Sequence, residues 1–382
     1  MGTASDLTYP DEPLSAWDLD AVNPLLVWAV EQGFSDITLR PKSPVRGRLH
    51  GRWYAITRRP LMPDEVSNVA NQLTRDASAS AKAHSGSPTD FAYEVQAGRG
   101  RFVRFRGNLS GCVSGWDSGS EVILRMIPGR PPTPAELGID SEMLQKLEPD
   151  TGLVLFSGTT GSGKSTSIAA VLKNILRYRR VNMQTIEDPV EFSLREDADD
   201  VGFCTQHEVP AHYQNFGVAL RNMVRKAPDV VLVGEMRDRE TMQNGLHLAN
   251  AGAVVYSTLH ADSVPQTLAQ IVNRFDYSER AGVWAQLMPA TRTVVYQKLE
   301  PCEQGGRLCI REWLEVTPDV RRELQGAEVK NIVRVTQEML EASGRPLIAD
   351  AKEKLEGGLI SEETYTRITQ ERMHQDRRGR AA

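Results

Sequence analysis

Gly158-Thr159-Thr160-Gly161-Ser162-Gly163-Lys164-Ser165-Thr166 decides the fold, because its spacing, G-x-x-x-x-G-K-[ST], is that of a phosphate-binding loop. The three glycines let the backbone curve closely, so that successive N–H groups face phosphate oxygens. The lysine would reach the β- and γ-phosphates of a nucleotide, and the serine after it would bind Mg²⁺. All nine residues are therefore predicted to bind a nucleotide.

The segments on both sides of the loop support this interpretation. The apolar run 152–157 is typical of a buried parallel strand. After the loop, apolar residues recur at helical spacing at Ile168, Val171, Leu172, Ile175 and Leu176. Strand, glycine loop and helix form the order that a phosphate site at a helix N-terminus requires. The alternative is a glycine-rich loop that binds no ligand.

Length and composition indicate a globular protein of two or three domains, with 382 residues and 40% hydrophobic side chains. No apolar run reaches the roughly 20 residues that span a bilayer, and residues 1–13 lack a signal-peptide core. We therefore expect a cytoplasmic protein, with room for a peripheral membrane partner. The four cysteines form no C-x-x-C pair, which argues against a zinc clip or a disulfide framework.

Charge is spread unevenly along the chain. The net charge of −5 argues against a protein that binds nucleic acid over its whole surface. Between Arg40 and Arg59, however, there are seven Lys or Arg residues and no acid. This basic stretch is either a patch for anionic lipid or nucleic acid or, as we favour, the solvated face of a strand.

The first part of the chain has the pattern of a small α+β domain. Residues 1–16 are expected to be a flexible arm. A helix is predicted to open with Asn23 as its N-cap and Pro24 as its first residue, and a second one near 64–73. Short strands are predicted at 36–40, 48–56, 91–95, 101–105 and 121–127. We place this domain at residues 17–127.

A proline-rich segment separates this domain from the rest. Four prolines in the seven residues 128–134 cannot continue a helix or a central strand, so 128–137 is predicted to be a hinge linker. Apolar strands, among them 230–233 and 253–257, then alternate with helices in the manner of a parallel α/β sheet. This second domain is assigned to 138–345, followed by a helical tail, 346–382.

Acids and a histidine follow the predicted strands of the second domain. Residues 185–192, TIEDPVEF, place Glu187, Asp188 and Glu191 together. The apolar strand within 229–238 ends with Glu235, at a position from which a general base can act. Residues 257–261 end the next predicted strand with His260. Each signal alone is weak, since surface acids and single histidines are usually structural.

The four motifs taken in order resemble those of the secretion-superfamily traffic ATPases, which include type II secretion motors, type IV pilus motors such as PilT, and type IV secretion ATPases. The resemblance covers roughly residues 20–345 and extends into the first domain at 35–39, 90–95 and 101–105. It implies a RecA-like P-loop ATPase domain preceded by a PAS-like domain, with ATP and Mg²⁺ as cofactors.

The resemblance also implies roles for the acids and the histidine. Glu235 takes the place of the catalytic base, and Gly234 stands where other P-loop proteins have an aspartate. Metal coordination would then move toward Glu187, Asp188 and water, in addition to Ser165. His260 would sense the γ-phosphate or link subunits, and a core histidine is the alternative.

Four arginines match those that contact the nucleotide in this family. They are Arg104, Arg125, Arg221 and Arg225. The last two are four residues apart and are predicted on one helical face. A glycine- and serine-rich insertion at 111–120 makes the match in the first domain less secure. Structural salt bridges are the alternative role for each arginine, and any of them could act across a subunit boundary.

Within the family we favour the branch of the type IVB secretion and IncI conjugation ATPases, DotB and TraJ. The extra N-terminal domains and four-cysteine insertion of the extension ATPases are missing, and residues 318–324 depart from the retraction motif A-I-R-N-L-I-R-E. This predicts a homo-hexamer peripherally bound to the inner membrane through apparatus proteins, without direct nucleic-acid binding. The alternatives are a pilus retraction ATPase and, from another class, a non-hydrolysing ATP-gated scaffold.

Overall fold

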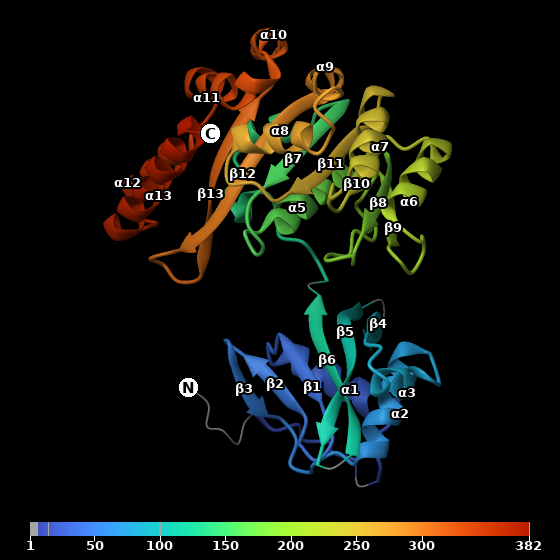
Figure 1. Ribbon diagram of the computed structural model, residues 1–382. Helices are drawn as coiled ribbons and strands as arrows, with labels where there is room; N and C mark the ends of the chain where they lie inside the picture. The colour runs from blue at the N-terminus through green and yellow to red at the C-terminus, as the bar shows by residue number, and fades with distance from the viewer. Residues whose placement is uncertain (1–6, 14, 99–100, 116, 128, 382) are drawn as a thin grey trace. The chain divides into compact units, whose positions relative to one another are not determined.

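A computed structural model describes residues 7–13, 15–98, 101–115, 117–127 and 129–381 (Figure 1). The chain divides into two compact units, Met1–Gly129 and Arg130–Ala382. Each unit is built around one sheet, of six strands in the first and seven in the second.

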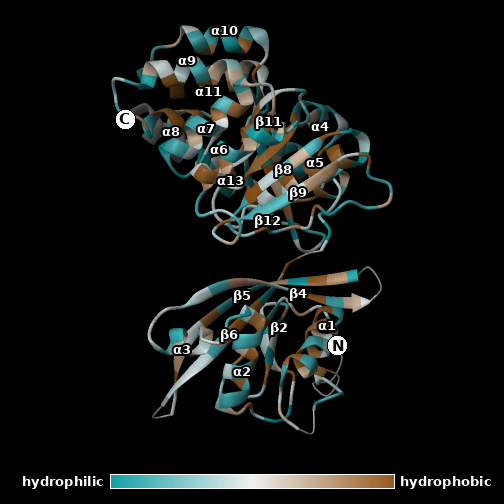
Figure 2. Ribbon diagram, turned by 90° about the vertical axis from the view of Figure 1, so that its right-hand side faces the viewer, coloured by the Kyte–Doolittle hydropathy of each residue, from teal (hydrophilic) through white to brown (hydrophobic). Residues whose placement is uncertain are grey.

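The first unit is an antiparallel sheet with helices on one face. Its elements are α1 (Leu19–Glu31), β1 (Asp36–Leu39), β2 (Arg46–Leu49), β3 (Arg52–Ala55), α2 (Pro63–Thr74), α3 (Ala79–His84), β4 (Thr89–Gly98), β5 (Arg101–Ser114) and β6 (Asp117–Ile127). The strand order is β3-β2-β1-β6-β5-β4. Alternate residues of β5, such as Phe105 and Leu109, point to the helices and are buried, as period-two side chains require. The three helices lie on the same side of the sheet (Figure 2). This agrees with the predicted small α+β domain.

The predicted start of the first helix is wrong. Helix α1 begins at Leu19, with the Asp18 side chain capping the N–H of Ala21, so Pro24 lies inside it. Asn23 instead accepts a hydrogen bond from the Tyr93 hydroxyl at 2.6 Å. The proline pattern was misleading because tertiary contacts and an earlier cap extend the helix by a turn.

The glycine- and serine-rich segment noted at 111–120 contributes residues 111–114 to β5 and 117–120 to β6. β5 and β6 pair through it, with Gly111 opposite Ser120 and Ser114 opposite Asp117. Small residues fit here because a side chain at Gly111 would lie 2.5 Å from the carbonyl oxygen of Ala83. Gly111 therefore marks the close approach of α3, whereas Gly115, with a φ of +74°, lies in a turn.

The expected arm, 1–16, falls partly outside the described residues. In its described part Tyr9 is buried against Trp28, and its N–H bonds to the carbonyl oxygen of Ile56 at 2.8 Å. Glu12 accepts the N–H of Arg58. This part of the arm is therefore packed on the unit and not free.

The second unit is a mainly parallel sheet covered on both faces. Its elements are η2 (Ala135–Leu137), α4 (Ser141–Leu147), β7 (Gly152–Ser157), α5 (Lys164–Tyr178), β8 (Asn182–Glu187), β9 (Phe203–Glu208), α6 (Phe216–Met223), η3 (Val224–Lys226), β10 (Val230–Val233), α7 (Arg239–Asn250), β11 (Val254–Leu259), α8 (Val264–Asn273), α9 (Arg280–Ala290), β12 (Thr291–Pro301), β13 (Arg307–Glu315), α10 (Pro318–Gly326), η4 (Val329–Asn331), α11 (Ile332–Ser343), α12 (Leu347–Glu356) and α13 (Glu362–Ala381). The strand order is β13-β12-β7-β11-β10-β8-β9, and β13 alone of these strands pairs antiparallel.

Neighbouring residues of β7 enter different cores. Leu153 and Leu155 pack with the helices that follow α5, whereas Val154 and Phe156 pack with α4 and α5. Such two-sided burial explains the continuous apolar runs that predicted parallel strands, and Figure 2 shows hydrophobic residues along these strands. The predicted α/β fold with a RecA-like domain is confirmed.

The C-terminal helices belong to the second unit. α12 contacts β13, and Ile368 of α13 joins the same core as the central strands. Arg372 of α13 forms a buried ion pair with Glu312 of β13 at 2.7 Å. The segment predicted as a helical tail is thus packed on the sheet over its described side chains. Among the described residues, no helix is long and apolar enough to cross a membrane.

Candidate functional site

The glycine loop lies at the carboxyl end of β7, as the motif requires. Gly158, Gly161 and Gly163 have φ angles of +145°, +79° and +85°. Side chains rarely adopt these values, and a Cβ at Gly158 would lie 2.3 Å from the carbonyl oxygen of Gln297. The glycines are therefore needed for the path of the loop, and α5 begins directly after it at Lys164.

Lys164 is buried and folded back on the loop. Its Nζ donates to the carbonyl oxygens of Gly158 at 2.8 Å and Thr159 at 3.0 Å. Burial lowers the pKa of Lys164, while the charges of Glu235 and Glu191 act to raise it. An ammonium held only by neutral carbonyls is well placed to exchange them for phosphate oxygens.

The remaining loop residues also fit a phosphate. Thr159, Thr160 and Gly161 are exposed, and Thr166 is half-buried in the first turn of α5. Ser162 is buried, and within the described residues its Oγ has no hydrogen-bond partner. A buried hydroxyl without a partner is uncommon and would be satisfied by a ligand oxygen. The loop therefore has the shape, the donors and the helix N-terminus of a phosphate site.

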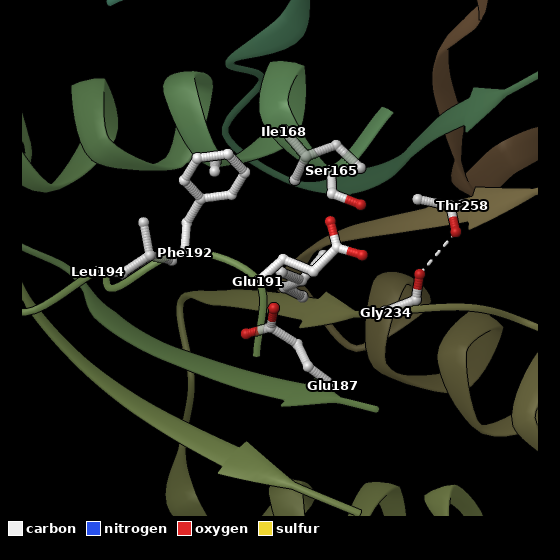
Figure 3. A pocket seen from close by; sticks show the side chains of 10 residues that line it. Ser165, Ile168, Glu187, Glu191, Phe192, Leu194, Gly234 and Thr258 are labelled. Carbon is white, nitrogen blue, oxygen red and sulfur yellow. Dashed lines mark hydrogen bonds between the residues drawn. The ribbon is translucent and has the colours of Figure 1, made fainter. Parts of the chain in front are cut away.

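A small pocket beside the loop collects residues from four strand ends. Ser165, Glu187, Glu191, Gly234 and Thr258 line it, and Figure 3 shows Glu191 between Ser165 and Glu187. These residues follow β7, β8, β10 and β11, which are neighbours in the sheet. The carboxyl ends of parallel strands meet at one edge, so residues far apart in sequence lie together here.

Glu187 ends β8 and is buried in this pocket. The Thr185 hydroxyl donates to its Oε1 at 2.7 Å, and the Gln206 amide donates at 3.2 Å. Burial raises the pKa of Glu187 to about 7, with the nearby charge of Glu191 adding to the effect. Near neutral pH this carboxyl can therefore hold or release a proton.

Gly234, which the resemblance places where other P-loop proteins have an aspartate, lies close to the end of β8. A Cβ at this position would lie 3.2 Å from the carbonyl oxygen of Ile186 and 3.3 Å from Cα of Glu187. The Gly234 N–H bonds to that carbonyl at 2.8 Å, and its own oxygen accepts from the Thr258 hydroxyl at 2.6 Å. β8, β10 and β11 are thus joined tightly at this point.

Glu235, the predicted base, is held by two cationic or polar neighbours. Arg237 Nε donates to Glu235 Oε2 at 2.8 Å, and His260 Nε2 lies 3.4 Å from Oε1. Arg237 also lies 3.9 Å from Asp188, the acid that follows Glu187. The structure therefore links Asp188, Arg237, Glu235 and His260 in a chain of contacts, in that order.

The donor set fits Mg²⁺ bound mainly through ligand oxygens and water. Ser165 and the carboxylates of Glu187 and Glu191 face the same pocket. Over the described residues there is no cluster of three or more His, Cys, Asp or Glu that could hold a metal by itself. Mg²⁺ commonly takes one or two protein ligands beside phosphate oxygens, so this set is sufficient.

The predicted arginine pair of the second unit lies elsewhere. Arg221, in α6, pairs with Glu240 of α7. Arg225 lies in η3, beyond the end of α6, and its Nη1 donates to the Arg221 carbonyl at 3.4 Å. Both side chains are exposed, and neither lines the pocket beside the loop. The pair was predicted on one helical face, and the structure places Arg225 in a 3₁₀ turn that follows α6.

Arg104 and Arg125 lie on one face of the first unit's sheet, opposite its helices. Arg125 pairs in register with Arg106, which is two residues from Arg104 on β5. Arg125 Nε donates to Asp36 at 2.7 Å, and Arg104 stands opposite Glu94. A structural ion pair is thus present at Arg125, and the nucleotide contact of both residues stays a prediction.

Four residues of the site were not assigned a role by sequence. Glu191, Arg237 and Thr258 lie inside the quoted motifs, so their positions beside the predicted residues were the available signal. Gln297 of β12 donates to the carbonyl oxygen of Ser162 at 2.8 Å. Nothing local marked it, because it reaches the loop only through the pairing of β12 with β7.

The parallel sheet, the loop and the acids at the strand ends define a P-loop nucleotide-binding protein of the RecA-like class. The family model described as type II/IV secretion system protein matches residues 116–367. The chain therefore belongs to this family. Its similarity to the relatives described next identifies it as a PilT-like traffic ATPase.

Three relatives illustrate the likeness. The type IV pilus retraction ATPase PilT of Pseudomonas aeruginosa is 32% identical over 342 residues, which cover 90% of this chain and 96% of PilT. The crystal structure of the Legionella pneumophila ATPase DotB has a TM-score of 0.85 and 30% identity, covering 94% of this chain and 98% of DotB. A crystal structure of PilT with bound ADP has a TM-score of 0.78 and 27% identity, covering 90% of this chain and 95% of that one.

Proposed function

We propose that this protein hydrolyses ATP to power a type IVB secretion or conjugative transfer apparatus. The observation that carries the proposal is the likeness to DotB, which extends over both units and nearly the full length of that ATPase. The site residues described above supply the chemistry that such an activity needs.

Phosphate binding is assigned to the glycine loop and Lys164. The lysine would leave the carbonyl oxygens of Gly158 and Thr159 and bind the β- and γ-phosphates, while the loop N–H groups surround them. Ser165 would bind Mg²⁺, with Glu187 and Asp188 acting on its waters. When bound, Mg²⁺ would neutralise part of the negative charge of the phosphates.

Glu235 is assigned as the base that accepts a proton from the attacking water. Its two oxygens are held apart by different partners, Arg237 on one and His260 on the other. This fixes the carboxylate at the strand end, where a water beside the phosphate would meet it. His260 also offers a donor toward the γ-phosphate.

Force generation is assigned to a homo-hexamer. In each subunit, ATP binding would close the two units over the nucleotide and so rotate one unit against the other. The linker 128–137 would act as the hinge; its residue 128 lies outside the described residues. Arg104, Arg125, Arg221 and Arg225 would contact the nucleotide, some of them from a neighbouring subunit. The ring would sit in the cytoplasm, peripherally attached to inner-membrane apparatus proteins, without direct contact to nucleic acid.

Pilus retraction is the second candidate function, favoured by the identity to PilT over most of both chains. A strain of the source organism carrying Glu235→Gln in place of the native gene separates the two. We expect loss of protein secretion or conjugative transfer with unchanged pilus-driven surface motility. The reverse pattern would replace the proposal with retraction.

The ring can be tested with the purified full chain. Light scattering after size exclusion is expected to give six times the 42.4 kDa chain mass in the presence of a non-hydrolysable ATP analogue. A Lys164→Ala chain is the matched control, since it should not respond to the analogue. A persistent monomer with bound analogue would contradict the hexamer.

A further inference from the structure

The fold divides the basic stretch 40–59 into residues with different surroundings. Arg59 is neutralised by Glu65 of α2 at 2.8 Å, and Arg52 is exposed on β3. Arg40, Lys42 and Arg46, in contrast, line one open hollow of about 510 Å³. The solvated strand face expected from sequence therefore describes only part of the stretch.

This cationic hollow is formed by residues 40–44, 46, 112–115 and 121. Two distant segments meet there, the turn between β1 and β2 and the hairpin between β5 and β6. β6 runs from this hairpin to Ile127 at the other end of the sheet (Figure 1). The hollow thus lies within the first unit, at the opposite end of β6 from the start of the linker.

The charges that line the hollow are not balanced. Arg40, Lys42 and Arg46 face a single lining acid, Glu121. In the part of the chain that the structure describes, none of the three cations forms an ion pair. The Nζ of Lys42 donates to the Ser114 carbonyl at 3.2 Å, which positions the ammonium without neutralising it. The lining therefore has an excess of two positive charges.

Two of the residues that line the hollow carry a buried donor without a partner. Ser114 is 7% exposed, and neither its Oγ nor the Nε of Arg46 has a hydrogen-bond partner among the described residues. Buried polar atoms are nearly always bonded, so unpartnered ones beside a cavity indicate a missing ligand or water. Ser114 and Arg46 thus add an unpartnered hydroxyl and an unpartnered guanidinium N–H to the residues that line the hollow.

We propose that the cationic hollow binds a phosphate monoester group. Such a group carries a charge of about −1.5 to −2 near pH 7 and three strong acceptor oxygens, which matches the excess charge and the number of donors. Carboxylates and phosphodiesters carry one charge and leave the hollow positive. Arginine guanidinium groups are also suited to phosphate by their fork of N–H donors. The site is independent of the nucleotide site and of the proposed function.

Inorganic phosphate is the first probe, used with the full-length chain. Because the glycine loop also binds phosphate, calorimetric titrations are made on the Lys164→Ala chain and again on the unaltered chain saturated with ADP. In each of these two samples we expect one phosphate to bind, with a dissociation constant of about 1 mM or lower. Arg40→Gln and Arg46→Gln should each weaken it at least tenfold, and Ser114→Ala about threefold.

Arg52→Gln is the matched control, because it removes a charge from the same basic stretch outside the hollow. It should leave phosphate binding unchanged, and thermal midpoints of all variants should agree with their parent, which separates lost binding from unfolding. Equal weakening by Arg52→Gln and Arg46→Gln would overturn the proposal in favour of diffuse charge. The proposal would also be overturned if the chain bound neither free phosphate nor the phosphatidic acid vesicles described next.

Vesicle sedimentation distinguishes a lipid source from a free one. Val113 on the rim is 87% exposed and could contact a bilayer. Phosphatidylcholine vesicles with phosphatidic acid, a monoester, are compared with vesicles of equal charge containing phosphatidylglycerol, a diester. Binding to phosphatidic acid that Arg46→Gln abolishes supports the proposal with a lipid headgroup as source. Binding of free phosphate without vesicle binding supports it with a soluble source, and equal binding to both lipids contradicts it.

Discussion

The two units present their charged residues in opposite ways. In the second unit, parallel strands end at one edge, so acids from β8 and β10 and a histidine after β11 meet beside the glycine loop. In the first unit, antiparallel strands spread charged residues over a sheet face, where Arg125 meets Asp36 and Arg104 stands opposite Glu94. Parallel topology thus brings residues from distant motifs to one edge, whereas the antiparallel sheet leaves Arg104 and Arg125 on a sheet face beside acids of neighbouring strands.

Lys164→Ala should have the largest effect on nucleotide binding by the second unit. Removing the ammonium that donates to the loop carbonyls should weaken ATP binding at least about 100-fold, because a charged donor to phosphate is lost. Calorimetry with ATP measures the change. Lys173→Ala, on the same helix but paired with Asp200, is the control and should retain ATP affinity. Retained affinity in Lys164→Ala would remove the loop from the site.

The raised pKa of Glu187 gives a pH dependence of stability. Its pKa is about 7 in the folded chain against an ordinary value of 4.5, so the folded state binds more protons in this window. Stability should therefore fall as pH rises from about 4.5 to 7, by about 2 to 3 kcal/mol for this group.

Glu187→Gln should remove this part of the pH dependence. Thermal midpoints at pH 5 and pH 8 are compared in the unaltered chain, in Glu187→Gln and in a control, Glu142→Gln, whose carboxylate is exposed on α4. The unaltered chain and the control should lose more stability than Glu187→Gln. An identical pH response in all three would show that Glu187 is ionised normally.

Arg237→Ala tests whether Glu235 must be held in place. Loss of the 2.8 Å contact should lower kcat for ATP hydrolysis about 30-fold, since a misplaced base loses its geometry, while KM changes little. Arg239→Ala, which breaks an exposed pair with Glu279, is the control and should keep kcat. A change in KM alone would assign Arg237 to nucleotide binding.

Arg125→Ala addresses the first unit and should have the smallest effect. If the residue contacts phosphate as the resemblance implies, kcat/KM should fall about tenfold. Asp36→Asn breaks the same ion pair without removing the guanidinium and should leave hydrolysis unchanged. Equal, small effects of both substitutions would make the pair structural.

Sequence predicted the second unit better than the first for physical reasons. Sequence could predict the glycine loop, β7, α5 and the acids at the strand ends, because the local pattern and the parallel topology agree there. Gln297 escaped notice because its contact depends on β12, a strand that sequence did not single out. Asn23 was wrongly assigned as the cap because an earlier cap, Asp18, starts the helix at Leu19.

The basic stretch shows the same limit in another form. Its charge was evident from sequence, but which cations are neutralised depends on tertiary contacts. Arg59 meets Glu65, which lies outside the basic stretch at the start of α2, whereas Arg46 has no acidic partner among the described residues. Charge patterning alone therefore could not separate the solvated residues from those of the cationic hollow.

The most direct test of the central claim, that the strand ends of the second unit form an ATP-hydrolysing site, is ATP turnover by Glu235→Gln. We expect kcat for ATP hydrolysis to fall about 100- to 10,000-fold, with ATP affinity changed less than about threefold. Glu338→Gln, exposed on α11 and paired with Arg334, should match the unaltered chain. Equal turnover, or equal inactivity, of the unaltered chain and Glu235→Gln with ATP still bound would contradict it.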